Sequence, residues 1–438
     1  MLSVAMLLIG SVALTLGVNG QHGAQDSAVV TLGQRLFEDS RLSSPEGDLA
    51  NSCSSCHLQD QDPQGHRVFT DFFNRSWVPY RSKDPRRSEL RNSPTILDSA
   101  SMPSLHFDGE YASLEDLVRA TLSGRPMGWL PTEANQAFDH IYKTILEDSG
   151  EPTTHSAKTY ADEFKRAFNV DIKAAGRQST IDLTVNAISS YVRTLKSARN
   201  TPYDRFAAAN ALPSSPRQNE SVRRFAHKLL EQIASLESEG SVRFVAGFER
   251  EALSGFKIFL TTSGASASGN CVTCHAPPLF TDLSFHNMGV SQAEYESIHG
   301  TGSFERLPIP NAAAANRPST DFRETPTREN ASLVDLGHWN FVDVKASPLR
   351  RAGETEDRFL ARMIATFKTP TLRNLAYSHP YLHNGAFTTL EATLLELKRL
   401  SELARKGQIR KADEDLVRIR ISEDDIKRLT AFLRTLND

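Results

Sequence analysis

Two short stretches of the chain combine cysteine and histidine with the same spacing. One reads C-S-S-C-H at residues 53–57 and the other C-V-T-C-H at residues 271–275, and together they use every cysteine in the sequence. This spacing is the attachment signal for c-type haem, in which two thiols form thioethers with the haem vinyl groups and the adjacent histidine becomes an axial iron ligand. The residues predicted to hold two covalent haems are Cys53, Cys56, His57, Cys271, Cys274 and His275.

Two other uses of four cysteines compete with this interpretation. An exported protein commonly pairs its cysteines in disulfides. Two C-x-x-C pairs can also bind one zinc ion through four thiolates, provided that the pairs meet in space. Both alternatives leave the histidine that follows each pair unexplained, so the pattern favours haem.

The chain is duplicated around these two motifs. Gly33-Gln-Arg-Leu-Phe precedes the first motif, and Gly255-Phe-Lys-Ile-Phe precedes the second. R-N-S-P-T-I-L and F-D-G-E-Y-A-S-L-E follow the first motif, while F-K-T-P-T-L-R-N and H-N-G-A-F-T-T-L-E follow the second. The halves end alike, in Y-V-R-T-L and F-L-R-T-L. A repeat of this kind indicates two copies of one module.

Local patterns predict that the modules are mainly helical. Ile426, Leu429 and Phe432 recur at helical spacing after Ser422, with Asp425 placed for a capping box. Ser113 with Asp116, and Thr388 with Glu391, give the same start signal. Residues 286–345 are predicted to be a long loop with little regular structure, and residues 201–249 a polar linker that leads into the second module.

The composition is that of an ordinary globular protein. A net charge of -3 over 438 residues gives no electrostatic reason to expect nucleic acid or an anionic membrane as a partner, and the length predicts two domains. Residues 1–20 contain no charged side chain and are typical of a secretory signal, although no lysine or arginine precedes Arg35. We expect export to the periplasm, with an uncleaved anchor as the alternative. The expected domains are 21–200 and 201–438.

The order of the sequence motifs resembles that of the bacterial dihaem cytochrome c peroxidases and of the wider superfamily that includes the MauG-type enzymes. The resemblance is carried by LGQRLFEDSRLS, RNSPT, FDGEYASLED, FTDLSFHNMGV and FKTPTLRNLAYSHPYLHNGAFTTLE around the two haem motifs. It implies a mainly α fold, with two cytochrome c-like haem domains in tandem, long irregular loops, and haems that face the domain interface. It also implies a calcium ion between the domains and a possible homodimer.

The resemblance implies an activity as well. Hydrogen peroxide would be reduced at the N-terminal haem, with electrons from a small c-type cytochrome or copper protein that enter through the C-terminal haem. By its position in FDGEYASLED, Glu115 would be the catalytic acid that moves the proton. A second interpretation stays open, because Glu391 stands at the same place in the second module and acidic residues are favoured in any first helical turn.

The sequence departs from the family pattern at several positions. The residue expected to bind the second haem from its distal side is Leu397, which has no ligand atom; Lys398, His379 and His383 are alternatives. The tryptophan expected between the haems is missing, and His106 is a possible polar partner there. His66 is a possible removable ligand of the first haem. A MauG-type oxidase and a non-catalytic dihaem electron-transfer or redox-sensing protein are therefore alternative functions.

Overall fold

The computed structural model describes residues 16–47, 50–61, 67–70, 91–150, 158–263 and 267–437. The predicted fold class is confirmed, because this part of the chain is mainly α-helical. The helices are α1 (Leu16–Glu38), α2 (Cys53–Cys56), α3 (Leu114–Leu122), α4 (Ala134–Leu146), α5 (Tyr160–Phe168), α6 (Ile172–Val192), α7 (Pro202–Ala209), α8 (Val222–Ser238), α9 (Arg250–Leu260), α10 (Val290–His299), α11 (Glu356–Arg362), α12 (Leu390–Arg405) and α13 (Glu423–Arg434).

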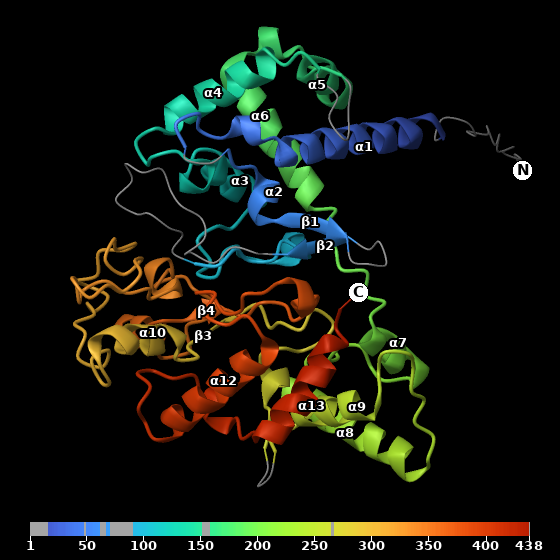
Figure 1. Cartoon of the computed structure of the whole chain (residues 1–438), viewed down its shortest axis with the longest axis vertical. Coiled ribbons are helices and arrows are strands. Elements are labelled where there is room, and N and C mark those ends of the chain that lie inside the picture. Colours follow the sequence, from blue (N-terminus) through green and yellow to red (C-terminus); the bar gives the residue numbers. More distant parts are fainter. Residues whose placement is uncertain are drawn as a thin grey trace, which may run out of the picture.

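The chain forms two lobes stacked along its long axis (Figure 1). The upper lobe contains α1 to α6, and the lower lobe contains α7 to α13. Each lobe has its own hydrophobic core, one built from residues between 28 and 195 and the other from residues between 203 and 436. Strands are short and antiparallel: β1 (Leu58–Gln61) pairs with β2 (Arg67–Thr70), and β3 (Phe285–His286) pairs with β4 (Phe367–Lys368).

A close helix crossing is repeated in the two lobes. In the upper lobe α1 crosses α6, and a Cβ atom added to Gly33 would lie 1.9 Å from the carbonyl oxygen of Ala187. In the lower lobe α9 crosses α13, and a Cβ atom on Gly255 would lie 1.9 Å from the carbonyl oxygen of Arg428. Only glycine allows the backbones to approach this closely. The two copies of the Gly-x-x-(Leu/Ile)-Phe motif therefore have the same structural role, which is to provide the glycine at a close helix crossing.

Gly255→Ala is expected to destabilise the protein by about 1–3 kcal/mol, because the helices must move apart to admit the methyl group. At an open position in a helix the same change would stabilise by about 1 kcal/mol. Chemical denaturation of the haem-loaded protein measures the difference. Ser254→Ala, one position earlier, is the control and should change little, because the Ser254 hydroxyl donates to the carbonyl of Arg250 in its own helix. A stabilised Gly255→Ala variant would show that the crossing opens freely.

A tight turn after each haem motif is repeated as well. The N–H of Leu105 donates to the carbonyl of Tyr111 over 2.7 Å, and the N–H of Tyr381 donates to the carbonyl of Phe387 over the same distance. Each turn contains a glycine with positive φ, which is 72° in one turn and 62° in the other. The segments that contain FDGEY and HNGAF therefore share one backbone conformation.

Two of the three predicted helix starts are confirmed. The side chains of Ser113 and Ser422 accept hydrogen bonds from the backbone three residues on, at the start of α3 and α13. The third prediction is wrong by one residue, since Thr389 rather than Thr388 caps α12. Both positions carry threonine, and the path of the preceding turn decides which one faces the helix.

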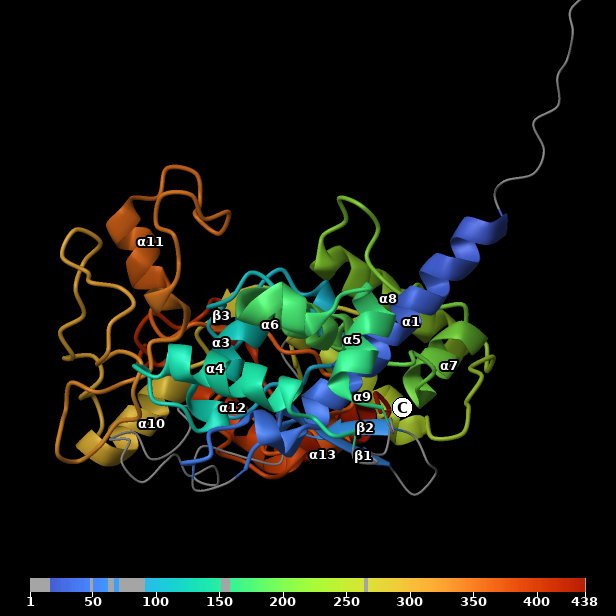
Figure 2. The same ribbon diagram turned by 90° about the horizontal axis from the view of Figure 1, so that it is seen from above.

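The long loop expected at residues 286–345 is only partly irregular. It contains α10, and together with the segment up to residue 365 it forms a third hydrophobic cluster around the fully buried Trp339. This region, with α11, lies together at one side of the molecule (Figures 1 and 2). The supposed linker 201–249 is also structured, because Phe206 on α7 and Phe225 on α8 are buried in the core of the lower lobe.

Most of the expected signal segment, residues 1–15, lies outside the described residues. Among the helices that the structure describes, none has the length and apolar character needed to cross a bilayer.

Candidate haem centres

The first motif forms a single helical turn, α2. The N–H of His57 donates to the carbonyl of Cys53 over 2.9 Å, which closes the turn over both cysteines. At its start the N–H of Ser52 donates to Oγ of Ser55 over 3.0 Å. Both cysteines and the histidine are partly buried, and burial raises the pKa of Cys53 to about 12. The turn therefore presents the two cysteines at the edge of the upper core, with the thiol of Cys53 neutral.

The second motif has the same turn. The N–H of His275 donates to the carbonyl of Cys271 over 2.8 Å. Nδ1 of His275 lies 2.9 Å from the carbonyl oxygen of Phe280, an arrangement in which Nδ1 carries the proton and Nε2 has the lone pair that a metal requires. Burial lowers the pKa of His275, although hydrogen bonds to the carbonyls of Phe280 and Pro370 oppose the shift. The neutral imidazole is thus favoured.

Neither competing use of the cysteines is found in the structure. All four cysteines lie among the described residues and none is in a disulfide. Within the described part of the chain, no cluster of potential metal ligands joins cysteines of the two motifs, so a four-thiolate zinc site is not formed. Burial raises the pKa of Cys271 to about 12 and also raises that of Cys274, which keeps the thiols protonated.

A histidine between two carboxylates lies beside the second motif and was not singled out from the sequence. Nδ1 of His286 is 2.7 Å from Oδ2 of Asp413, and its Nε2 is 2.8 Å from Oδ2 of Asp282. Burial alone lowers the pKa of His286, but the two carboxylates outweigh burial and hold it far above its ordinary range. The charged ring joins the loop that carries Phe280 to the segment after α12. The four-residue spacing of Asp282 and His286 could have indicated their contact from the sequence. Nothing in the sequence indicated that Asp413 would be the second partner.

Glu115 lies at the start of α3 in an ion pair. Nη2 of Arg193 is 2.7 Å from Oε1 of Glu115, whose side chain is 39% exposed. The second lobe repeats this contact, since Nη2 of Arg434 is 3.0 Å from Oε1 of Glu391. The duplication therefore accounts for the ion pair in both lobes, whatever chemistry Glu115 performs.

The lobes meet through two equivalent backbone hydrogen bonds. The N–H of Asn92 donates to the carbonyl of His383 over 2.7 Å, and the N–H of Lys368 donates to the carbonyl of Phe107 over 2.7 Å. Asn92 and Lys368 hold the same place in RNSPT and FKTPT, while Phe107 and His383 begin FDGEY and HNGAF. Each lobe thus offers the same two positions to the other, as in a two-fold symmetric interface.

The side chains of the two donor residues repeat the reciprocal pattern. Nδ2 of Asn92 is 2.5 Å from the carbonyl oxygen of Pro380, and Nζ of Lys368 is 2.7 Å from the carbonyl oxygen of Ser104. Pro380 and Ser104 are themselves equivalent, each three residues before the carbonyl that accepts the backbone bond. The interface differs between its halves in the donor side chain, an amide on one side and an ammonium on the other.

A buried ionic network extends this interface. Arg91 reaches Asp335 with its Nε and Nη2 over 2.5 and 2.6 Å, and Asp108 with its Nη1 over 2.5 Å. Both carboxylates are essentially inaccessible to solvent. Nearby, Nδ1 of His338 donates to the carbonyl of Asp108 over 2.7 Å. The region that was expected to be a loop therefore holds the two lobes together.

The residues considered as further haem ligands have other contacts or lie elsewhere. Leu397 packs against the core of the lower lobe, as its apolar side chain predicts. Nζ of Lys398 lies 2.9 Å from Oε1 of Glu402 on the same helix. The ring of His383 stacks on Phe367 with centroids 3.6 Å apart.

Two further histidines between the haem motifs were considered. Nδ1 of His106 lies 3.5 Å from Oε2 of Glu110, and its ring meets Tyr111 edge-on. His66 lies outside the described residues.

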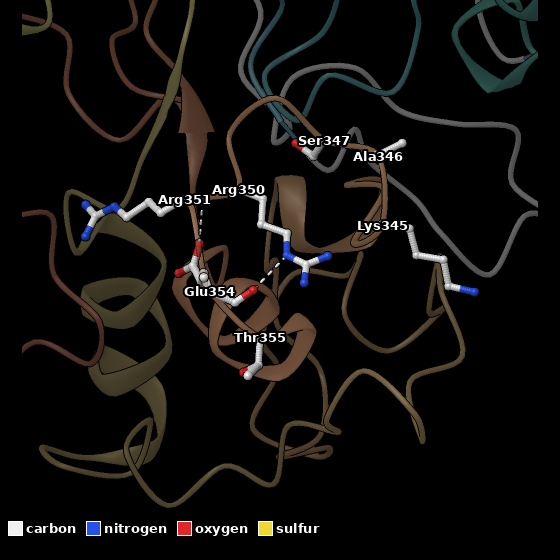
Figure 3. A pocket seen from close by; sticks show the side chains of 8 residues that line it. Lys345, Ala346, Ser347, Arg350, Arg351, Glu354 and Thr355 are labelled. Atoms are coloured by element: carbon white, nitrogen blue, oxygen red, sulfur yellow. Dashed lines mark hydrogen bonds between the residues drawn. The ribbon is translucent and has the colours of Figure 1, made fainter.

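A pocket of about 460 Å³ lies in the segment before α11 (Figure 3). Lys345, Arg350 and Arg351 give its wall a positive charge. Arg350 donates to the carbonyl of Glu354, and Arg351 pairs with Glu414 over 3.0 Å. None of the predicted site residues lines it.

The comparisons with known proteins agree with this architecture. The family described as di-haem cytochrome c peroxidase matches residues 27–211. The cytochrome-c peroxidase IdrP2 of Denitromonas iodatirespirans is 26% identical over 416 residues, which cover 94% of this chain and 83% of the relative. The methylamine utilization protein MauG of Methylophilus methylotrophus is 25% identical over 407 residues, covering 93% and 82%.

Residues 27–211 match this family, and over almost its whole length the chain is similar to cytochrome-c peroxidases and MauG proteins. A solved member of similar fold, the diheme peroxidase BthA of Burkholderia thailandensis, superposes with a TM-score of 0.56 at 17% identity, over 94% of this chain and 86% of that one. The superfamily consists of oxidoreductases, and its cofactors are two covalently bound c-type haems.

The cysteine motifs of this chain fit that cofactor. Each motif offers two thiols that are not in disulfides, and in each the backbone N–H of the histidine donates to the carbonyl of the first cysteine. In the second motif the Phe280 carbonyl also sets the tautomer of His275 that leaves Nε2 for iron.

Proposed function

We propose that this protein is a periplasmic dihaem peroxidase that reduces hydrogen peroxide to water with electrons from a small c-type cytochrome or copper protein. Cys53, Cys56 and His57 would hold the haem at which peroxide reacts. Cys271, Cys274 and His275 would hold the haem that receives electrons. The observation that carries the proposal is the reciprocal interface, which joins two equivalent redox modules into one unit.

Two joined redox centres match the stoichiometry of the reaction. Each peroxide molecule takes up two electrons and two protons, its O–O bond breaks, and two water molecules form. The haems supply the redox chemistry when bound. The chain must supply the protons, the ligands and a fixed distance between the centres. The hydrogen bond from His275 to Phe280 orients the second histidine, and the clamp of His286 between two carboxylates fixes the loop that carries Phe280.

We keep Glu115 as the proton-carrying carboxyl group of this proposal and test it against its own duplicate. Glu115→Gln retains the size of the side chain and an oxygen for Arg193 but cannot release a proton. We expect kcat/KM for peroxide to fall about 100-fold, the ordinary contribution of a general acid. Stopped-flow mixing of the protein with peroxide and a reduced cytochrome measures this rate.

Glu391→Gln is the matched control, because it changes the equivalent ion pair in the second lobe. It should leave peroxide turnover near the wild-type value. Equal effects of the two substitutions would mean that both glutamates serve only to fix their helices against Arg193 and Arg434.

A MauG-type oxidase is the second candidate, because the chain is about as similar to a MauG protein as to a peroxidase, at 25% and 26% identity. The same experiment separates them. Rapid oxidation of a small donor protein favours the peroxidase. The intact protein could instead react with peroxide but turn over poorly with small donors. That result favours an oxidase that acts on a protein or organic substrate. No reaction at all would leave an electron-transfer or redox-sensing protein.

We further propose that a calcium ion binds between the lobes at Asn92. This side chain is 6% exposed, and its Oδ1 is buried with no hydrogen-bond partner among the described residues. The two ends of an amide differ little in shape. Half a turn of the amide would bring Oδ1 to the carbonyl oxygen of Pro380, now 2.5 Å from Nδ2. Two facing oxygens of this kind are ligands that calcium prefers.

Removal of calcium should lower the thermal stability of the protein. At a free calcium concentration of about 100 times Kd, binding to the native state alone adds about 2.7 kcal/mol. We expect EGTA to lower Tm correspondingly, and Asn92→Ala to have the same low Tm with or without calcium. A wild-type Tm that is the same in calcium-containing buffer and after the calcium has been removed with EGTA would contradict the proposal.

A further inference from the structure

The two-fold relation between the lobes places a lysine where the other half of the interface has Asn92. Lys368 occupies the equivalent position in the duplicated segment, and its backbone N–H makes the equivalent bond to the other lobe. Its Nζ lies 2.7 Å from the carbonyl oxygen of Ser104, the counterpart of the Pro380 carbonyl. A positive charge therefore already sits at one of the two equivalent positions.

Burial and a neighbouring carboxylate act in opposite directions on the charge of Lys368. Burial lowers the pKa of Lys368 to about 8, and the buried carboxylate of Asp108 opposes this shift, so the ammonium form still predominates at neutral pH. Asp108 also forms an ion pair with Arg91. The positive charges on this side of the interface are therefore balanced by a buried carboxylate. On the opposite side, Asn92 brings no charge and leaves Oδ1 without a partner.

We propose that the lobes are joined by two cations at equivalent positions, one built in and one exchangeable: the ammonium group of Lys368, and the calcium ion at Asn92. This inference rests on the calcium site proposed above. Lys368 would make its half of the interface independent of calcium. The stability of the other half, at Asn92, would depend on the calcium concentration.

The exchange of side chains between the two positions tests the proposal. Asn92→Lys should supply the second fixed ammonium group at the Pro380 carbonyl. Calcium titration of the haem-loaded variant by isothermal calorimetry should then show no binding, and its Tm should no longer change with EGTA. Lys368→Asn should create a second amide site at the Ser104 carbonyl and raise the calcium stoichiometry from one ion to two.

Lys368→Met is the control, because it removes the charge and adds no oxygen. Its Tm should fall equally with and without calcium, and its calcium stoichiometry should stay at one. The proposal is overturned if Lys368→Met has the wild-type Tm, or if Lys368→Asn is folded and binds no additional calcium.

The failure of the calcium site can be distinguished from the failure of this inference. If the wild-type protein binds no calcium, the calcium proposal is wrong. The Tm of Asn92→Lys then tests by itself whether the interface has two equivalent cation positions. A Tm above that of the wild type would support two equivalent cation positions. A lower Tm, in a variant that retains both haems in its visible spectrum, would overturn them.

Discussion

Replacement of Cys53 and Cys56 by serine is expected to leave a protein with one covalent haem that does not turn over peroxide. The proposed peroxide-reacting haem is attached through these two thiols, and the cofactor rather than the protein carries the redox chemistry. Because enzymes accelerate their reactions by at least about 10⁶-fold, loss of this haem should reduce turnover to the background rate. Mass spectrometry of the denatured chain counts the haems, and donor oxidation measures turnover.

The matched variant replaces Cys271 and Cys274, which form the same turn in the second lobe. It should also carry a single haem, and it should still react with peroxide but should not accept electrons from the reduced donor. The opposite assignment, in which this variant fails to react with peroxide and the first variant reacts, would exchange the roles that we propose for the two lobes.

Asp335→Asn is expected to lower the free energy of unfolding by about 3–5 kcal/mol, the usual effect of removing one partner of a buried ion pair. Asp335 receives two hydrogen bonds from Arg91 and is shielded from solvent. Without its charge, Arg91 is left with Asp108 alone. Urea denaturation of the haem-loaded protein measures the change.

Glu414→Gln is the control for this substitution. It breaks the ion pair with Arg351, in which both side chains are mostly exposed, and surface pairs contribute about 0–1 kcal/mol. Equal effects of the two substitutions would show that burial of the Arg91 network adds nothing to stability.

The stabilisation by Asp335 is expected to depend on pH. Burial alone would raise the pKa of Asp335, but the charge and hydrogen bonds of Arg91 outweigh it and lower the pKa in the folded state. The stabilisation is therefore complete above about pH 4, the ordinary pKa of an aspartate. It is lost as pH falls through the folded-state value. The difference between wild type and Asp335→Asn should shrink only in acid.

The sequence alone was sufficient for the features that depend on neighbouring residues. The two haem motifs, the helical class and the duplication are local patterns, and the turns at Cys53 and Cys271 are as alike in structure as in sequence. The cap of α12 shows the limit of such patterns. Thr388 and Thr389 are chemically equal, so the preceding turn, which is set by distant contacts, decided between them.

The tertiary structure decided which residues of the two copies meet. Arg91 and Asn92 of the first copy contact Asp335 and His383 of the second, far along the chain. No spacing rule relates such residues, because their contact depends on how the two lobes pack. The duplication predicts two similar modules, but a repeated sequence is compatible with many ways of docking them. Only the folded chain shows that they dock reciprocally, since each lobe must satisfy the other's buried backbone groups.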